Sequence, residues 1–434
     1  MAQIFPFRAV RYNLERVKLA DVATQPYDKI TPEMQDRYYA ASPYNLVRII
    51  LGKPEGHGSN GSVYTRAANC FRDWRKQGIF LQDDRPSIYA YRQRFKVPAL
   101  GTERERIGFI ALGRIEDYSA GGIFRHEQTL AKPKADRLEL LRATRAHFGQ
   151  IFMLYSDASG EIERSLPIQE ASDIDFIDEF GVHQQVCRIS DPLVIEKIVG
   201  TMQDKKLIIA DGHHRYETAL NYRNECRTGA SADAASGAPQ PYEFVMMTFI
   251  NMESPGLVIL PTHRVVHGLA LFSADSLHEE ARRYFSVEEV DCSITGTRAM
   301  AILREAGHVG PAFLAITADR TFLIDRPLET SDVFHGLSLR QQSLDVVQLH
   351  KFLLEKVLGI SEEAIRNQQN VSYVRDADEA IKRVRQHGAN VAFVMNPVRI
   401  QQVRNVALAG EVMPQKSTDF YPKLLSGLTI YALD

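Results

Sequence analysis

The amino-acid sequence predicts a mixed α/β fold. Along the whole chain, apolar or alternating runs typical of strands are interspersed with segments whose apolar residues recur at helical spacing. Several strand-like segments are joined by short turns, which favours antiparallel pairing, and no repeat occurs at a fixed period. A chain of 434 residues is too long for one ordinary core. We therefore expect a mixed α/β body of two or three domains, or one elaborated body.

The N-terminal part, residues 1–228, is predicted to form one α/β region. Four prolines interrupt its first 45 residues, and the later elements follow from the apolar pattern. Strands are expected at 45–51, 87–97, 106–116, 151–156 and 207–210, and helices at 62–78, 191–202 and from 136 onward up to the strand at 151.

Residues 229–241, rich in Ala, Gly, Ser and Pro, are predicted to be a flexible loop or linker. The C-terminal part, 242–434, is predicted to be a second α/β region that completes the core. Strands are expected at 243–252, 256–266 and 390–398, a hairpin at 312–324, and helices at 273–285, 343–359 and 378–388.

Composition narrows the function classes. The 52 basic and 54 acidic residues are spread along the chain and give no general field for nucleic acid or an anionic membrane. No apolar run reaches the length of a membrane span, and the N-terminus lacks the pattern of a signal peptide. The cysteines, at 70, 187, 226 and 292, lie far apart. A cytoplasmic protein that binds small molecules is expected.

The segment "LIIADGHHRYETAL", residues 207–220, joins a strand to a helix through a polar turn. Asp211 is predicted to be the N-cap and Gly212 to allow close backbone approach, while His213, His214 and Arg215 lie on the first helical turn. Cationic groups are unfavourable at that end of a helix unless an anion binds there. A phosphate site at 211–215 is therefore predicted, the alternative being a capped helix whose imidazoles bond to the backbone.

Metal binding at this turn is a weaker alternative. His213 and His214 point about 100° apart on a helix, so they do not share one ion easily, although His213 and Glu217 are spaced to do so. Mg²⁺ held mainly by nucleotide phosphates is easier to accommodate, and no protein-only metal site is predicted.

Two further clusters carry polar groups suited to phosphate chemistry. In "RHEQT" and "KPKADR", His126 and Glu127 offer a general base, and three cations offer charge neutralisation; these are Lys132, Lys134 and Arg137. The alternative is a solvated loop capped into a helix by Asp136.

In "MPQKSTDFYPK", Lys416, Ser417 and Thr418 offer a cation and hydroxyls, but the glycines of a Walker loop are absent. The alternative is an exposed turn. His263 and Arg264, in "PTHR" at a predicted strand end, are weaker candidates. The "GHGSNG" run at 56–61 lies too far past its strand for a dinucleotide fingerprint.

These segments together resemble a prokaryotic protein family, the domain of unknown function 1015 family. The resemblance is carried along nearly the whole chain by "PYDKI", "SPYNLVR", "RHEQT…KPKADRLELL", "ADGHHRYETAL", "GLVILPTHR" and "PQKSTDFYPKLLSGL". Gln25 and Asp419 depart from the family pattern, and neither removes a charged group. The "DGHHR" segment also resembles the phosphate-binding helix of the ParB-like superfamily, which includes kinases of free L-serine.

The ParB-like resemblance implies a nucleotide-binding core in which residues 211–215 hold nucleotide phosphates. The predicted function is a kinase that uses ATP or ADP with Mg²⁺ to phosphorylate a small metabolite such as L-serine. Glu127 or Asp28 is the candidate base, with His126 beside it, and Lys416 and Arg264 add positive charge. Ser417, Thr418 and His263 join the phosphate site, while Tyr27, Asn45 and Thr129 are predicted to bind substrate.

Two other functions stay open. One is a nucleotide-binding regulatory protein that uses the same turn without turnover. The other is a metal-dependent hydrolase that uses His126, Glu127, Asp211 and His213. The expected partners are a nucleotide and a small substrate, with neither nucleic acid nor membrane, and the sequence leaves the oligomeric state open.

Overall fold

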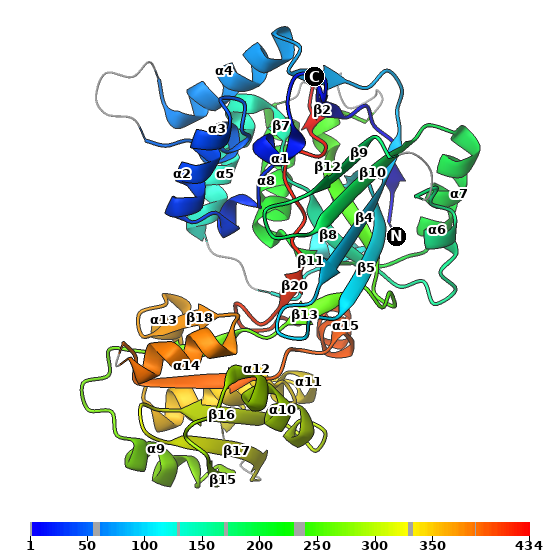
Figure 1. The fold of residues 1–434 in the computed structure, drawn as a ribbon. Coiled ribbons are helices and arrows are strands. Elements are labelled where there is room, and N and C mark those ends of the chain that lie inside the picture. Colours follow the sequence, from blue (N-terminus) through cyan, green and yellow to red (C-terminus); the bar gives the residue numbers. More distant parts are fainter. Residues whose placement is uncertain are drawn as a thin grey trace. The chain divides into compact units, whose positions relative to one another are not determined.

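The structure is a computed structural model that describes residues 2–54, 61–127, 131–168, 172–229, 239–328, 333–386 and 388–434. Its chain folds into two compact units (Figure 1). The first unit contains residues 1–125, 129–258 and 422–434, and the second contains 126–128 and 259–421. The mixed α/β class predicted from the sequence is confirmed.

A nine-stranded mixed sheet forms the centre of the first unit. Its strand order is β6-β11-β8-β12-β5-β4-β10-β9, with β1 added to β5, and the β6–β11 and β8–β12 pairs are parallel. The strands are β1 Ile4–Phe5, β4 Ile88–Lys96, β5 Glu103–Arg114, β6 Ile123–Phe124, β8 Ile151–Tyr155, β9 Ile174–Ile177, β10 His183–Ile189, β11 Leu207–Asp211 and β12 Phe244–Asn251.

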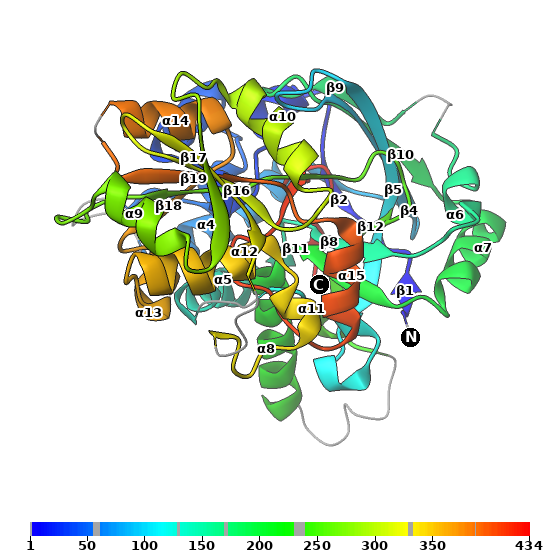
Figure 2. The ribbon, with the colours of Figure 1, turned by 90° about the horizontal axis from the view of Figure 1, so that it is seen from below.

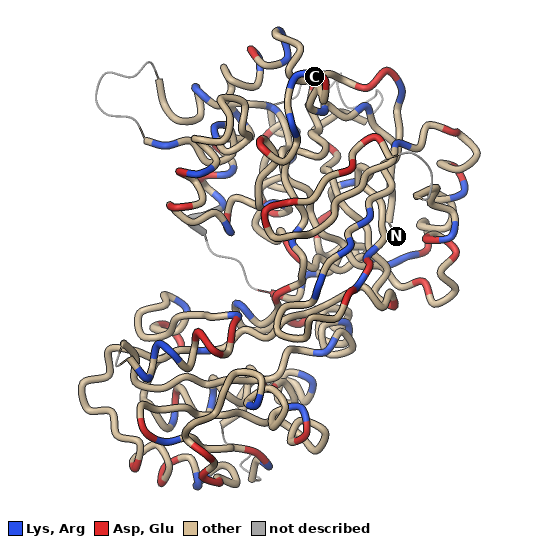
Figure 3. Tube along the Cα trace, viewed as in Figure 1, with Lys and Arg blue, Asp and Glu red and all other residues tan. Residues whose placement is uncertain are grey.

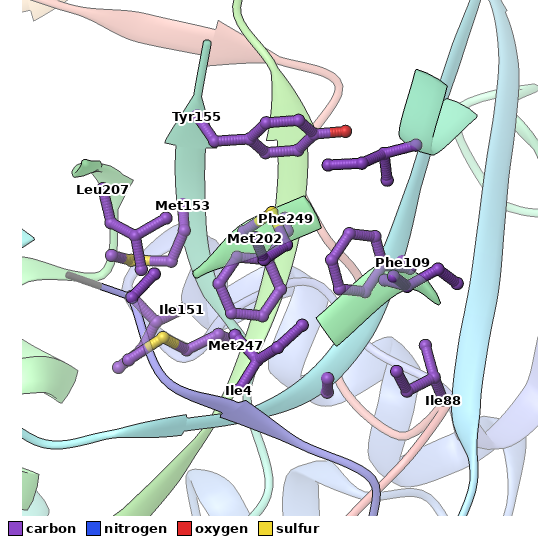
Figure 4. Close-up of a cluster of buried hydrophobic side chains, with 14 of the residues drawn as sticks. Ile4, Ile88, Phe109, Ile151, Met153, Tyr155, Met202, Leu207, Met247 and Phe249 are labelled. Carbon is purple, nitrogen blue, oxygen red and sulfur yellow. The ribbon is translucent and has the colours of Figure 1, made fainter. Parts of the chain in front are cut away.

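The main core lies on one face of this sheet. Alternate residues of the central strands point to that face, as the two-residue period of a strand requires. Phe109 of β5 and Phe249 of β12 stack there with ring centroids 5.0 Å apart (Figure 4). Helices α6 (Glu161–Arg164) and α7 (Pro192–Met202) cover this face with buried apolar residues, among them Ile162 and Met202.

The C-terminal segment 422–434 packs against polar groups of β4, β5 and the turn before β8. Gln93 and Arg106 donate hydrogen bonds to the carbonyls of Lys423 and Pro422, and Gln150 donates to Leu425. The end of the chain is thereby brought beside β11, although more than two hundred residues separate them in sequence. This return is what places Lys423 near Asp211.

A group of helices completes the first unit, in which α5 contacts both α4 and α8. Figure 1 shows α2 to α5 and α8 gathered on one side of the sheet. The helices are α1 Leu19–Val22, η1 Tyr27–Lys29, α2 Pro32–Ala41, α3 Val47–Ile50, α4 Val63–Lys76, η2 Tyr118–Ala120, α5 Ala131–Thr144, α8 His213–Gly229 and η4 Pro241–Glu243. Short strands β2 Val10–Tyr12, β3 Phe80–Gln82, β7 Ala146–His147 and β21 Tyr431–Ala432 pair in two small sheets.

An antiparallel six-stranded sheet forms the second unit, in the order β15-β17-β16-β19-β14-β18. Helices α10 and α14 cover one face (Figures 1 and 2), and α9 contacts both β15 and η6. The strands of this sheet are β14 His263–Val266, β15 Phe285–Val290, β16 Ala312–Ile316, β17 Thr321–Pro327, β18 Val371–Val374 and β19 Val391–Met395. A separate two-stranded sheet pairs β13 Val258–Leu260 with β20 Asp419–Tyr421. The helices are α9 Ala274–Ala281, α10 Gly296–Ala306, α11 Leu339–Gln342, α12 Asp345–Gln348, η6 Leu349–Val357, α13 Glu362–Arg366, α14 Ala377–Arg385 and α15 Ile400–Leu408.

Several elements differ from the sequence prediction. Residues 45–51 are not a strand, because Val47–Ile50 form α3 and the Asn45 side chain accepts a bond from the Val47 backbone N–H. A short buried apolar run has no period that separates strand from helix. The predicted strand at 256–266 is divided into β13 and β14 around Pro261, which lacks the N–H that a ladder needs. The predicted helix at 343–359 is α12 followed by the π-helical segment η6.

The helix predicted to begin near Asp136 begins earlier, at Ala131, so Lys134, Asp136 and Arg137 all lie on α5. The chain divides between the two units at 258–259 and not at 229–241, because β12 is a central strand of the first sheet. None of the described helices combines the length and the apolar character needed to span a bilayer. Basic and acidic residues are interspersed along the trace of both units (Figure 3).

Candidate functional site

The turn between β11 and α8 is built around Gly212. β11 ends at Asp211 and α8 begins at His213. Gly212 has φ of 93°, a conformation that side chains disfavour, and its carbonyl accepts the first helical hydrogen bond, from the Tyr216 N–H at 2.9 Å. Gly212 therefore occupies the N-cap position, and the prediction that Asp211 is the cap is wrong. A strand that runs directly into a helix leaves only one residue for the change of direction.

Asp211 instead faces basic side chains of the first unit. Its Oδ2 lies 3.4 Å from Nη2 of Arg215 and 3.9 Å from Nζ of Lys423. Burial alone raises the pKa of this carboxyl group, but Lys423, then Arg215 and then Lys29, outweigh it and hold the pKa well below its usual value. Three cations thus surround one carboxylate at the N-terminus of a 17-residue helix.

The segment "PYDKI" lies beside this turn, as contacts within the first unit show. The positive charge of Lys29 lowers the pKa of Asp211, and Tyr27 lines the same pocket as Arg215. Burial and then Asp28 raise the pKa of the Tyr27 phenol, while Arg137 and Arg215 oppose them. Asp28 itself is exposed. The structure therefore brings Tyr27 and Asp28 together with the 211–215 turn.

Arg215 is the hub of this region. Its Nη1 donates to the carbonyl of Gln150, its Nη2 to Asp211, and its Nε has no hydrogen-bond partner among the described residues. The hydrogen bonds to Gln150 and Asp211 fix the plane of the guanidinium.

A pocket of about 590 Å³ of empty space, counting its open side, lies against Arg215 in the first unit. Its walls are mostly apolar and come from α5, α8, β12 and the segments around 26, 50, 148 and 426. The Arg137 guanidinium lies 4.2 Å from the centroid of the Tyr27 ring at this pocket. Its polar lining residues are Tyr27, Arg137, His147, Arg215, Thr218 and Ser426.

Farther along α8, Glu217 is buried and paired with two cations. Its carboxylate lies 2.8 Å from Nζ of Lys134 and 3.5 Å from Nη1 of Arg125. These pairs neutralise Glu217 within the fold. Within the described ranges no three His, Cys, Asp or Glu side chains gather as a metal ion would require. The residues named for a hydrolase fall in both units, Asp211 and His213 in the first and His126 and Glu127 in the second.

In the second unit His126 and Glu127 of "RHEQT" lie beside residues of the "MPQKST" segment. The buried His126 ring Nε2 lies 2.8 Å from the Thr418 hydroxyl, and the His126 carbonyl accepts a bond from the Met413 N–H at 2.8 Å. Glu127 Oε1 accepts a bond of 2.9 Å from the backbone N–H of Lys416. Ser417 is buried and donates to the Pro414 carbonyl. These hydrogen bonds, most of which involve a backbone group, join the two segments into one cluster.

Arg264 joins the same cluster from β14. It is 1% exposed, its Nη2 donates to the Lys416 carbonyl at 3.2 Å, and its guanidinium lies 5.3 Å from the Tyr373 ring centroid. Burial lowers the pKa of this guanidinium to about 10, although Tyr373 and Glu127 oppose the effect. A guanidinium at that pKa remains charged at neutral pH.

His263 has a different role from the predicted phosphate ligand. It is the first residue of β14, and its Nδ1 accepts a bond from the Met395 N–H at 3.3 Å. Burial, and then Arg264, lower the pKa of His263 to about 4, so the ring is neutral at pH 7. It acts as a hydrogen-bond acceptor inside the sheet.

The remaining predicted residues are placed as follows. Asn45 is buried, and both ends of its amide are used by Asp21 and Val47 of the backbone. Lys416 is exposed and adopts φ of 57°. His214 is on the first turn of α8. Thr129, the Lys132 side chain and most of the 229–241 loop lie outside the described residues.

Sequence reasoning did not single out Lys29, Lys423 or Thr218. Lys29 and Lys423 were inside the quoted segments "PYDKI" and "DFYPK", but nothing in a linear pattern shows which distant lysine reaches Asp211. Thr218 lies one turn beyond Arg215 on the same face of α8, a spacing that can be read from the sequence.

Comparisons with known proteins give one family match and several distant structures. The family model described as "Protein of unknown function (DUF1015)" matches residues 4–347. No curated protein matches the chain.

Among solved structures, a conserved hypothetical protein from Pyrococcus furiosus is 13% identical, with a TM-score of 0.35, over 71% of this chain and 91% of that one. A free serine kinase in complex with AMP is 13% identical, with a TM-score of 0.34, over 71% and 89%. SbnI from Staphylococcus aureus is 11% identical, with a TM-score of 0.35, over 74% and 87%. At these values the likeness says nothing of what this chain binds.

Proposed function

This chain belongs to the DUF1015 family of proteins of unknown function, and we propose from its own residues that it is a nucleotide-dependent kinase of a small hydroxylated metabolite. The observation that carries the proposal is the turn at 211–215. One carboxylate, Asp211, is surrounded there by Arg215, Lys423 and Lys29 at the start of α8. The surplus positive charge and the helix N-terminus both favour a bound anion.

A nucleotide phosphate is the anion that suits this turn best. Because Gly212 has no side chain, the Arg215 guanidinium packs against the turn itself, 3.1 Å from the position that a Cβ would occupy. Gln150 and Asp211 hold the Arg215 guanidinium in a fixed plane. A fixed guanidinium binds phosphate oxygens better than a mobile surface cation does. ATP or ADP is the proposed donor.

Phosphoryl transfer demands positioning and charge more than covalent chemistry. The acceptor hydroxyl oxygen forms a bond to the terminal phosphorus, the bond from that phosphorus to the bridging oxygen breaks, and a carboxylate takes the hydroxyl proton. Asp28, exposed beside Tyr27 in the same unit as the 211–215 turn, is the candidate for that base. Mg²⁺, carried by the nucleotide phosphates, would supply further neutralisation of the transferred group.

Free L-serine is the first acceptor to test. Purified protein is incubated with ATP or with ADP, Mg²⁺ and L-serine, and O-phosphoserine is measured by mass spectrometry. The proposal predicts product with the wild type and a loss of at least a hundredfold in Arg215→Ala. Arg142→Ala, which removes an exposed guanidinium of α5 paired with Glu139 and Glu225, is the matched control and should leave turnover unchanged.

Asp28→Asn tests this base, since a variant that lacks the base should lose turnover while it keeps nucleotide affinity. Turnover of other hydroxylated metabolites in a panel would retain the kinase and replace only serine. Nucleotide binding with no product from any acceptor would instead favour a regulatory protein. No binding of either nucleotide would overturn the proposal.

A further inference from the structure

The pocket beside Arg215 contains a buried hydroxyl group that the fold leaves unused. Thr218 is 4% exposed, lines the pocket from α8, and its Oγ1 has no hydrogen-bond partner among the described residues. A buried hydroxyl without a partner is costly, and native proteins rarely keep one without a reason.

A second unused polar atom lies on the same helix face. Arg215 and Thr218 are three residues apart on α8, a spacing that puts their side chains next to each other. The Nε of Arg215 also has no partner among the described residues, while its Nη1 and Nη2 are held by Gln150 and Asp211. The Thr218 hydroxyl and the Arg215 guanidinium are thus neighbouring polar groups of the pocket lining.

The charge of the pocket selects an anion. Of the described residues that line it, none is acidic and two carry guanidinium groups, Arg137 and Arg215. Asp136 offsets Arg137, and Asp211 is shared between Arg215 and Lys423. His147 adds no charge, because burial lowers its pKa to about 4. The ammonium group of an amino acid would find no counter-charge on these walls.

The remaining walls select an apolar body. Leu140 and Leu141 of α5, Ile50, Phe148 and Val245 line the pocket. A carboxylate suits a hydroxyl donor that lies near a guanidinium, since it accepts the hydrogen bond and pairs with the positive charge.

We propose that this pocket binds a small monocarboxylic acid with a compact apolar body, whose carboxylate accepts a hydrogen bond from Thr218 Oγ1 and pairs with the charge of the Arg215 guanidinium. This site goes beyond the proposed kinase function and does not depend on it. The acid is a separate ligand of the first unit that shares Arg215 with the proposed phosphate site, so its binding is tested without nucleotide.

The test is calorimetric titration of the full chain, without nucleotide, using three probes of one shape and different charge. These are benzoate, benzamide and benzylammonium. The proposal predicts that benzoate binds, that benzamide binds at least tenfold more weakly, and that benzylammonium does not bind. Equal affinity for benzoate and benzamide, or no binding of benzoate, would overturn it.

Two variants locate the site. Thr218→Val, which keeps the shape and removes the hydroxyl, should weaken benzoate roughly tenfold or more and raise the melting temperature of the unliganded protein. Thr228→Val, the same change at an exposed position of α8, should alter neither. A Thr218→Val protein that binds benzoate normally, or that is less stable than the wild type, refutes the assigned role of the hydroxyl.

Leu141→Phe, which fills the pocket from α5, gives an independent check. It should abolish benzoate binding while ADP binding persists, and this result separates the failure of the acid site from the failure of the kinase proposal. If instead adenosine binds and competes with benzoate, the pocket is a nucleobase site and the proposal is wrong.

Discussion

Nη2 of Arg215 lies 3.4 Å from Oδ2 of Asp211, one helical turn apart across the junction of β11 and α8. This ion pair does not neutralise all the positive charge at the turn, because Lys423 and Lys29 also interact with the same carboxylate. A surplus of positive charge therefore remains at the helix N-terminus, where the peptide dipoles also favour an anion. This imbalance is the physical basis of the proposed phosphate site.

Gly212→Ala tests whether the turn needs its glycine. Gly212 has φ of 93°, and an added Cβ would lie 3.1 Å from the Arg215 guanidinium. The strained backbone should lower the free energy of unfolding of the first unit by about 1 to 3 kcal/mol, measured by urea denaturation. Gly200→Ala in α7, where a Cβ meets no atom within 4 Å, should not destabilise and serves as the control. Equal stability of Gly212→Ala and the wild type would argue against a strained turn.

Substitutions of Lys416 test backbone strain in the second unit, where the Lys416 N–H bonds to Glu127. Its φ of 57° is unfavourable for a residue with a Cβ, at a cost of about 1 to 2 kcal/mol. Lys416→Gly should therefore be more stable than Lys416→Ala by about 1 kcal/mol, measured by chemical denaturation of both variants. The comparison cancels the loss of the lysine side chain. If the alanine variant is as stable as the glycine variant, the left-handed conformation is not a constraint in solution.

His263 makes stability depend on pH. Its folded pKa of about 4 lies below the ordinary value of 6.5, so the unfolded chain binds the proton more readily between these values. Stability should therefore fall as the pH falls from about 6.5 to about 4, and be unaffected by this group above 6.5. His263→Asn keeps an acceptor for the Met395 N–H and removes the titration.

The variant should flatten the pH dependence of the unfolding free energy by up to about 1.4 kcal/mol per pH unit in that window. Thermal melts at closely spaced pH values give the slope. An identical slope in wild type and His263→Asn would mean that the ring is solvated or already charged in the folded state.

Long periodic segments were predictable, and short apolar ones were not. The helix at 63–76, with Ala67, Phe71 and Trp74 buried, and the hairpin of β16 and β17 follow directly from their apolar spacing. Residues 45–51 did not, because a short apolar run suits a buried strand as well as a buried helix, and the Asn45 bond that decides between them is invisible in the pattern.

The candidate site was predictable as local chemistry but not as an assembly. The "ADGHHR" turn indicates an anion site from its own residues, and "RHEQT" and "PQKST" were expected to matter before Glu127 and Lys416 were seen to bond. Which lysine reaches Asp211 depends on the return of the C-terminal segment across the sheet, a long-range packing result. Likewise, the Thr218 hydroxyl is buried without a hydrogen-bond partner among the described residues only because α5 packs against α8, which the sequence does not show.

The central claim is that the 211–215 turn binds nucleotide phosphate. Calorimetric titration of ADP and of adenosine into the wild type and Arg215→Ala tests it most directly. The account predicts that ADP binds the wild type and loses at least tenfold in affinity in the variant, while any affinity for adenosine is unchanged. ADP binding equally to both proteins, or to neither, would contradict it.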